Sequence, residues 1–177
     1  DKAALTKKEE CNIIITSKGY MRRLPLTDLS SMNRGSRGKK QIKLNEGDFI
    51  QKSINSHSHD SLLFITDSGK TYIKSAYEIP DNEKGRNVNW ILDLADSENE
   101  KIIDVLTVDF EVPDQIIAMF TKKGLVKMSK LSEYENASRK GGVKGITLKE
   151  DDSILCAVVC TEKESLFMVN SNNLIIR

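Results

Sequence analysis

The turn TSKG at Thr16–Gly19 follows a run of three isoleucines, and similar turns return as TDSG at Thr66–Gly69 and TKKG at Thr121–Gly124. A fourth, altered copy reads NSNN at Asn170–Asn173. The last residues of the four turns are separated by 50, 55 and 49 residues, a spacing typical of propellers and solenoids. Glycine suits a turn position with positive φ, and asparagine tolerates the same geometry. The sequence therefore predicts an array of repeated units.

Each turn lies between two short apolar runs rich in β-branched and aromatic residues, a pattern typical of β-hairpins. After the first three hairpins come a glycine and, about six residues later, a leucine; these glycines are Gly38, Gly85 and Gly142. An acidic turn and another apolar strand follow in each copy. Four short strands in a period of about 50 residues are typical of a propeller blade. No helix is required by the pattern, and we expect Trp90 to pack between units where an apolar strand begins.

The composition places limits on the kind of site. The 177 residues carry 27 Lys and Arg against 26 Asp and Glu, so a basic surface has to come from segregated charges. Three cysteines without CxxC spacing argue against a disulfide framework and a zinc ribbon, and they fit a reducing, cytoplasmic setting. We expect no metal site, and no signal peptide or membrane span is visible. The final apolar run stops inside an expected strand, so we expect a piece of a longer polypeptide.

The first unit carries a resemblance to a known family. The segments KGYMRRLPLTD at Lys18–Asp28 and MNRGSRG at Met32–Gly38 resemble the start of the C-terminal domain of DNA gyrase A. That family carries a seven-residue box, QRRGGKG, in its first blade. Three positions match the box, Arg37 replaces its lysine, and three depart; the matches are Arg34, Gly35 and Gly38, and the departures are Met32, Asn33 and Ser36. Because Lys84–Arg86 and Arg139–Gly142 resemble the corresponding parts of the next two blades, the resemblance covers nearly the whole chain.

The resemblance implies an all-β fold, the β-pinwheel, a propeller-like disc whose neighbouring blades exchange strands and whose basic rim bends double-stranded DNA. About three and a half blades are expected in a partial domain spanning 1–177, at 12–57, 58–110, 111–160 and, incomplete, 161–177. It also implies a parent topoisomerase in which a tyrosine of another domain cuts the duplex. Gyrase B, the partner in an A2B2 heterotetramer, hydrolyses ATP there, with Mg²⁺. For this chain alone we expect no cofactor, no catalytic residue and no enzyme activity.

Neutralising phosphates along a bent duplex requires cations spaced over a convex surface. The richest segment runs from Arg34 to Lys43, where glycines remove side-chain bulk between the charges. Basic residues recur in later units at the corresponding place, and repetition in phase should bring them to one face. The expected DNA-binding residues are Arg34, Arg37, Lys39, Lys40, Lys43, Arg22, Arg23, Lys84, Arg86, Arg139, Lys140 and Lys144, with the box glycines Gly35 and Gly38.

Two alternatives stay open at this point. In the resembled family an intact box accompanies wrapping strong enough for negative supercoiling, whereas an eroded box is a feature of the topoisomerase IV paralogue, which serves relaxation and decatenation. A propeller-like disc can also act as a platform for protein partners, because fold alone does not fix function. A continuous basic strip on the perimeter favours DNA, and a broken strip with an apolar patch favours a protein partner.

Overall fold

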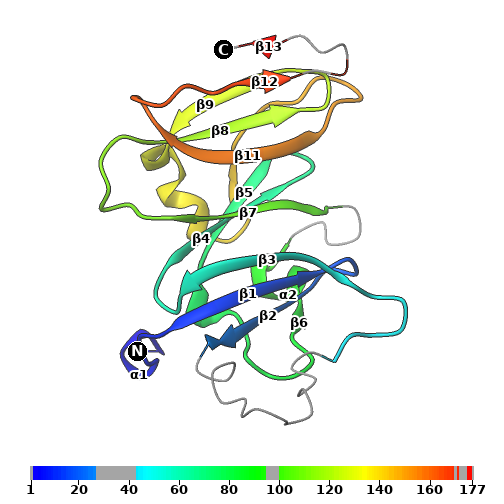
Figure 1. Ribbon diagram of the computed structural model, residues 1–177, viewed down its shortest axis with the longest axis vertical. Coiled ribbons are helices and arrows are strands. Elements are labelled where there is room, and N and C mark those ends of the chain that lie inside the picture. The colour runs from blue at the N-terminus through cyan, green and yellow to red at the C-terminus, as the bar shows by residue number, and fades with distance from the viewer. Residues whose placement is uncertain (1, 27–42, 95–99, 170, 172–174, 177) are drawn as a thin grey trace, which may run out of the picture.

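The computed structural model describes residues 2–26, 43–94, 100–169, 171 and 175–176. Figure 1 shows sheets stacked along the long axis of the molecule, each built around one hairpin. The longer strands are β1 (Glu10–Thr16), β2 (Tyr20–Pro25) and β3 (Ile50–His57) in the first unit, β4 (Ser61–Thr66), β5 (Lys70–Ser75) and β7 (Ile102–Val108) in the second, and β8 (Gln115–Thr121), β9 (Val126–Lys130) and β11 (Ile154–Thr161) in the third.

The remaining elements are short. Two strands follow the hairpins, a further hairpin begins a fourth unit, and the helices are between 3 and 8 residues long. They are β6 (Arg86–Asn87), β10 (Val143–Lys144), β12 (Met168–Val169), β13 (Ile175–Ile176), α1 (Lys2–Leu5), α2 (Val88–Leu92) and the 3-10 helices η2 (Ala76–Glu78) and η3 (Leu131–Ser138). The prediction of an all-β repeat is confirmed.

Neighbouring units exchange a strand. The first sheet has the order β3-β1-β2-β6, and its last strand is donated by the second unit, with Arg86 opposite Met21. The second sheet has the order β10-β5-β4-β7, and β10 comes from the third unit, with Val143 opposite Thr71. A blade in this fold is therefore completed by the unit that follows it, as the resemblance to a β-pinwheel implied.

Two glycines make the exchange possible. Gly85 and Gly142 precede the donated strands, with φ of +65° and +64°. A Cβ atom on Gly85 would lie 2.5 Å from the Met21 carbonyl oxygen, and one on Gly142 would lie 2.4 Å from that of Thr71. No side chain fits at such distances, so both positions need glycine for space as well as for backbone angle.

The hairpin turns are built alike. Gly19, Gly69 and Gly124 have φ between +75° and +83°, as the repeat predicted, whereas Asn173 lies outside the described residues. The threonine that opens each turn accepts the backbone N–H four residues later through Oγ1, at 3.2 Å for Thr16, 3.1 Å for Thr66 and 3.0 Å for Thr121. The turn motif thus sets the phase of the array.

The core is continuous from one unit to the next. In β4, Leu62 and Phe64 pack into a cluster shared with the first unit, while Leu63 and Ile65 pack into a cluster shared with the third. All four side chains are fully buried. Because successive side chains of a strand point to opposite faces, this uninterrupted apolar run indicates a strand covered on both sides.

The edge strands β3, β7 and β11, here called the inner edge, join the units. Asp104 of β7 is buried; its carboxylate pairs with the Lys52 ammonium of β3 and accepts the Ala157 N–H of β11 at 3.0 Å. One side chain thereby links three consecutive units. The exchanged strands β6 and β10 occupy the opposite edge of their sheets, the outer edge.

One sequence-based expectation is wrong. Residues 90–92 do not begin a strand; they belong to α2, where Val88 and Leu92 are buried but Trp90 is 78% exposed. The Asn87 side chain accepts the Asn89 N–H at 2.9 Å and caps the helix, and Asp93 ends it in the left-handed conformation with φ of +51°. Local capping therefore overrides the apolar run, and Trp90 does not pack between units.

Candidate nucleic-acid interface

The exchanged strands carry predicted cations to the outer edge of successive sheets. Lys84 and Arg86 flank Gly85 at the start of β6, and both side chains are exposed. In the next unit, Arg139 and Lys140 precede Gly142, Lys144 lies in β10, and these three are exposed as well. Because Gly85 and Gly142 are fixed against equivalent residues of the preceding hairpins, the two basic segments occupy matching places in the repeat.

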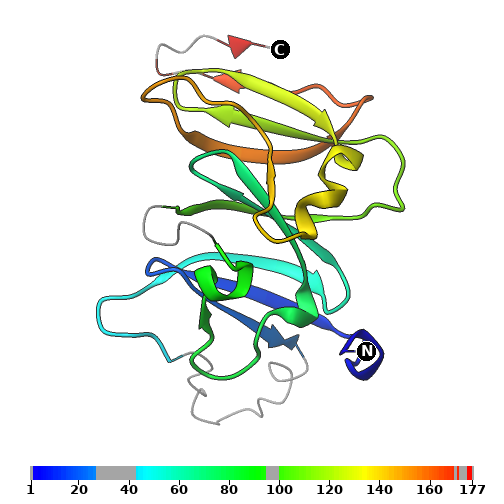
Figure 2. The ribbon, with the colours of Figure 1, turned by 180° about the vertical axis from the view of Figure 1, so that it is seen from behind.

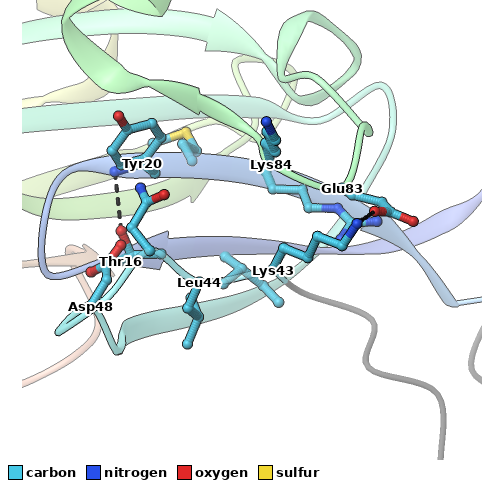
Figure 3. A pocket seen from close by; sticks show the side chains of 11 residues that line it. Thr16, Tyr20, Lys43, Leu44, Asp48, Glu83 and Lys84 are labelled. Atoms are coloured by element: carbon cyan, nitrogen blue, oxygen red, sulfur yellow. Dashed lines mark hydrogen bonds and ion pairs between the residues drawn. The ribbon is translucent and has the colours of Figure 1, made fainter.

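Three predicted cations from separate stretches of the chain meet at a hollow of the first unit. It is lined by Arg22 of β2, by Lys43 and by Lys84 of the following unit. Figure 3 shows Lys43 and Glu83 at one end of this hollow and Asp48 near Thr16 at the other. The structure therefore brings Arg22 and Lys43 next to the second basic segment.

Some of the exposed cations have acidic neighbours. Lys43 pairs with Glu83 at 2.8 Å, and hydrogen bonding and charge attraction in this pair raise the pKa of the Lys43 ammonium and lower that of the Glu83 carboxyl. Lys140 reaches Asp93 at the end of α2, with 3.3 Å between Nζ and Oδ2. All four side chains are largely exposed, so both pairs are worth little to stability and can open towards a phosphate.

Arg23 does not belong with the other candidates. Its residue is 6% exposed, and its guanidinium lies 3.5 Å from Glu9 and 3.1 Å from Asp81. Adjacent strand residues face opposite sides, so the neighbour of the partly exposed Arg22 points inward, opposite the buried Ile13. The prediction that Arg23 binds DNA is therefore wrong: its buried guanidinium forms ion pairs with Glu9 and Asp81 inside the protein.

The central part of the predicted site lies outside the described residues. This applies to the matched box positions, to Arg37 and to the two lysines that follow: Arg34, Gly35, Arg37, Gly38, Lys39 and Lys40. Their proposed role in DNA binding stays a prediction made from the sequence.

The acidic turns have a structural role that sequence reasoning missed. Asp48 Oδ1 accepts the Ser17 hydroxyl at 2.8 Å and the Lys18 N–H at 3.0 Å. These two hydrogen bonds, here called an acidic clip, join the first hairpin turn to the turn that precedes β3. In the third unit Asp152 Oδ1 accepts the Lys123 N–H at 3.0 Å in the same way. The shared spacing from turn to acidic cluster was the available signal.

Despite desolvation, the hydrogen bonds of these clips lower the pKa of both the Asp48 and the Asp152 carboxyl groups. Desolvation acts to raise the pKa of Asp48, but hydrogen bonds from its own turn and from the hairpin outweigh it and hold the pKa below its ordinary value. The pKa of Asp152 is lowered in the same way: desolvation acts to raise it, but hydrogen bonds from Thr121, Lys123 and Ser153 and the charge of Lys123 outweigh it. A carboxylate held ionised by N–H and O–H donors is a poor proton donor at neutral pH, which fits a clip rather than an acid catalyst.

A metal site is absent from the described part of the chain: no group of three or more His, Cys, Asp and Glu side chains there is placed to hold a metal ion. The three cysteines are free, and burial raises the pKa of the Cys11 thiol to about 11. None of the helices in the described ranges has the length and apolar character needed to span a bilayer.

Comparison with known proteins identifies the repeat. A family model described as the DNA gyrase C-terminal domain, a β-propeller, matches residues 13–53, 60–109 and 115–160. The chain belongs to this family. Within it, the DNA gyrase A protein of Campylobacter jejuni is 33% identical over 162 residues, which is 90% of this chain and 18% of that protein. The gyrase A protein of Staphylococcus aureus strain MRSA252 is 29% identical over 175 residues, 98% of this chain and 20% of that protein.

Solved structures give the same fold. A DNA gyrase A C-terminal domain superposes with a TM-score of 0.67 and 25% identity, over 87% of this chain and 49% of that one. A topoisomerase IV C-terminal domain superposes with a TM-score of 0.67 and 24% identity, over 87% of this chain and 46% of that one. The chain thus spans about a fifth of the curated gyrase A proteins and about half of the solved gyrase-type domains.

Proposed function

We propose that this gyrase-type domain binds duplex DNA along the outer edge of its sheets and bends it without reading base sequence. The observation that carries the proposal is the placement of exposed cations at matching positions of successive units, Lys84 and Arg86 in one and Arg139, Lys140 and Lys144 in the next. Cations spaced in phase along one edge can neutralise successive phosphates, and such contacts position a duplex but carry no sequence information.

The basic side chains of the outer edge have the chemistry that phosphate binding needs. Arg86 and Arg139 offer planar forks that grip two phosphate oxygens, whereas Lys84 and Lys144 act as mobile point charges. The net charge of the chain is only +1, so attraction to DNA has to come from this edge rather than from the whole molecule. Binding should therefore be local and strongly dependent on salt.

The activity of the parent protein is part of the same proposal. The gyrase A relatives support a component of an ATP-dependent type II topoisomerase in preference to its topoisomerase IV counterpart. On this proposal the chain is not an enzyme by itself: it presents the bent duplex, while strand cleavage and ATP hydrolysis with Mg²⁺ occur elsewhere in an A2B2 complex with gyrase B in the cytoplasm. An assay of the full-length enzyme for negative supercoiling, against relaxation and decatenation alone, tests the choice between the paralogues.

Fluorescence anisotropy with a labelled duplex, at several salt concentrations, tests the binding proposal directly. The double variant Lys84→Glu and Arg86→Glu removes two phosphate contacts, so the negative slope of log K against log salt should decrease in magnitude by about 0.9 per contact, or ~2 in all. The matched control is Lys122→Glu with Lys149→Glu, two exposed lysines outside the basic segments. Equal weakening by the two double variants would show that overall charge, and not the outer edge, governs binding.

A further inference from the structure

Trp90 is the single tryptophan of the chain, and it is 78% exposed. The helix that carries it is fixed: Val88 and Leu92 are buried, Asn87 caps the first turn, and Asp93 closes the last. The indole is therefore held outward on an ordered element. In Figure 2 the green helix α2 lies on the side facing the viewer, as does the yellow η3 of the next unit.

The surroundings of Trp90 indicate what it contacts. The helix follows directly after the strand β6, which begins with Arg86, so the basic segment of the second unit lies next to the start of the helix. At its end Asp93 is paired with Lys140, which belongs to the basic segment of the third unit. Trp90 thus lies between two successive groups of cations, and Asp93, three residues further on at the C-cap of α2, has a cationic partner in Lys140. A polyanion that contacts both groups has to pass over α2.

We propose that Trp90 is a DNA-contacting residue: its indole packs against the deoxyribose edge of the bound duplex, and its Nε1–H donates to a phosphate oxygen. An indole suits this position because one part of it is apolar and the other is a hydrogen-bond donor. The contact would be sequence-independent, as are the phosphate contacts on either side.

Insertion between base pairs is the less suitable geometry. A wedge pushed in from the minor groove kinks the duplex towards its major groove, away from the inserting protein. Bending around this edge requires curvature towards the protein. Packing along the backbone lets Trp90 fill the gap between two cation groups without opposing that curvature.

This inference rests on the proposed function, and the single tryptophan makes it directly measurable. Duplex DNA should quench the fluorescence of the 177-residue chain and protect Trp90 from acrylamide. Trp90→Ala should raise the Kd for duplex about fivefold, ~1 kcal/mol. Trp90→Phe, which keeps an aromatic surface but lacks the donor, should raise it less. Because no cation is lost, the salt slope should stay as in the unaltered chain.

Phe49→Ala is the matched control, since it also removes an exposed aromatic ring, 62% exposed, but beside the acidic turn at Asp48. It should leave the Kd unchanged. If the chain binds duplex and Lys84→Glu with Arg86→Glu weakens it, yet Trp90 stays open to acrylamide and Trp90→Ala binds normally, this inference fails and the proposed function stands. If the chain binds no duplex even at low salt, both fail.

Discussion

Comparing Gly142→Ala with Gly141→Ala should show how much stability depends on the close contact beside the exchanged strand, apart from the cost of positive φ alone. Gly142 has φ of +64°, and a Cβ there would lie 2.4 Å from the Thr71 carbonyl oxygen and 2.8 Å from the Tyr72 ring. The neighbouring Gly141 has φ of +88°, but a Cβ would meet nothing within 4 Å. Both substitutions place a methyl group on a residue with positive φ. Only Gly142→Ala also pushes that methyl group against the preceding unit, at Thr71 and Tyr72.

The magnitudes follow from these distances. A non-glycine residue in left-handed geometry costs roughly 1–2 kcal/mol, which applies to both variants. Overpacking of a close-packed interior adds about 1–3 kcal/mol, and it applies to Gly142 alone because the obstructing atoms are backbone and a buried ring. Gly142→Ala should therefore lower the free energy of unfolding by ~2–5 kcal/mol, and Gly141→Ala by only ~1–2 kcal/mol.

Urea unfolding followed by far-ultraviolet circular dichroism measures the difference. Amide hydrogen exchange adds a local reading, because the Gly145 N–H donates to the Gly69 carbonyl at 2.8 Å next to the exchanged strand. In Gly142→Ala this amide should exchange faster than in Gly141→Ala. Equal loss of stability in the two variants, with the Gly145 amide protected in both, would refute the claim that the close approach at Gly142 is needed to keep β10 paired with β5.

The inner edge and the acidic clips give two further predictions. Asp104→Ala should destabilise by about 2–4 kcal/mol, more than Lys52→Met, because Asp104 also accepts two backbone N–H groups whereas Lys52 is partly exposed; equal losses in urea unfolding would contradict this. The lowered pKa values of Asp48 and Asp152 mean that the stability from their ionised forms is present above the unfolded-state pKa, near 4, and is lost as pH falls through the lower folded-state values. In unfolding measurements, the double variant Asp48→Asn and Asp152→Asn should therefore lose less stability than the unaltered chain as the pH falls from 6 to 2.5.

The repeat could be recognised from the sequence because its determinants are local. A threonine and a glycine three residues apart define each described turn, and the glycines before the exchanged strands follow at similar intervals. One available signal was overlooked: Gly85 precedes Leu92 by seven residues, whereas Gly142 precedes Leu148 by six. The extra residue is accommodated where α2 forms, and that helix turns Trp90 outward.

Other features depend on contacts that sequence spacing does not reveal. Arg23 is buried because Glu9 and Asp81 approach it from distant parts of the chain. The Lys52–Asp104 pair could be predicted from the sequence only in part. Ile50 and Ile102 begin equivalent strands 52 residues apart, which places Lys52 and Asp104 at the same repeat position. Only the stacking of β3 beside β7 brings the two charges together.

The exchanged strands also determine the order in which this protein can fold during synthesis. The hairpin that ends at Pro25 has its outer partner only once Arg86 and Asn87 have left the ribosome, and the next hairpin waits for Val143. Pairing over such separations is slow compared with local contacts. Each nascent blade therefore exposes an open strand edge until the next one emerges, so a translational pause between Pro25 and Arg86, or between Ser75 and Val143, would prolong the time during which that edge is open to misassembly.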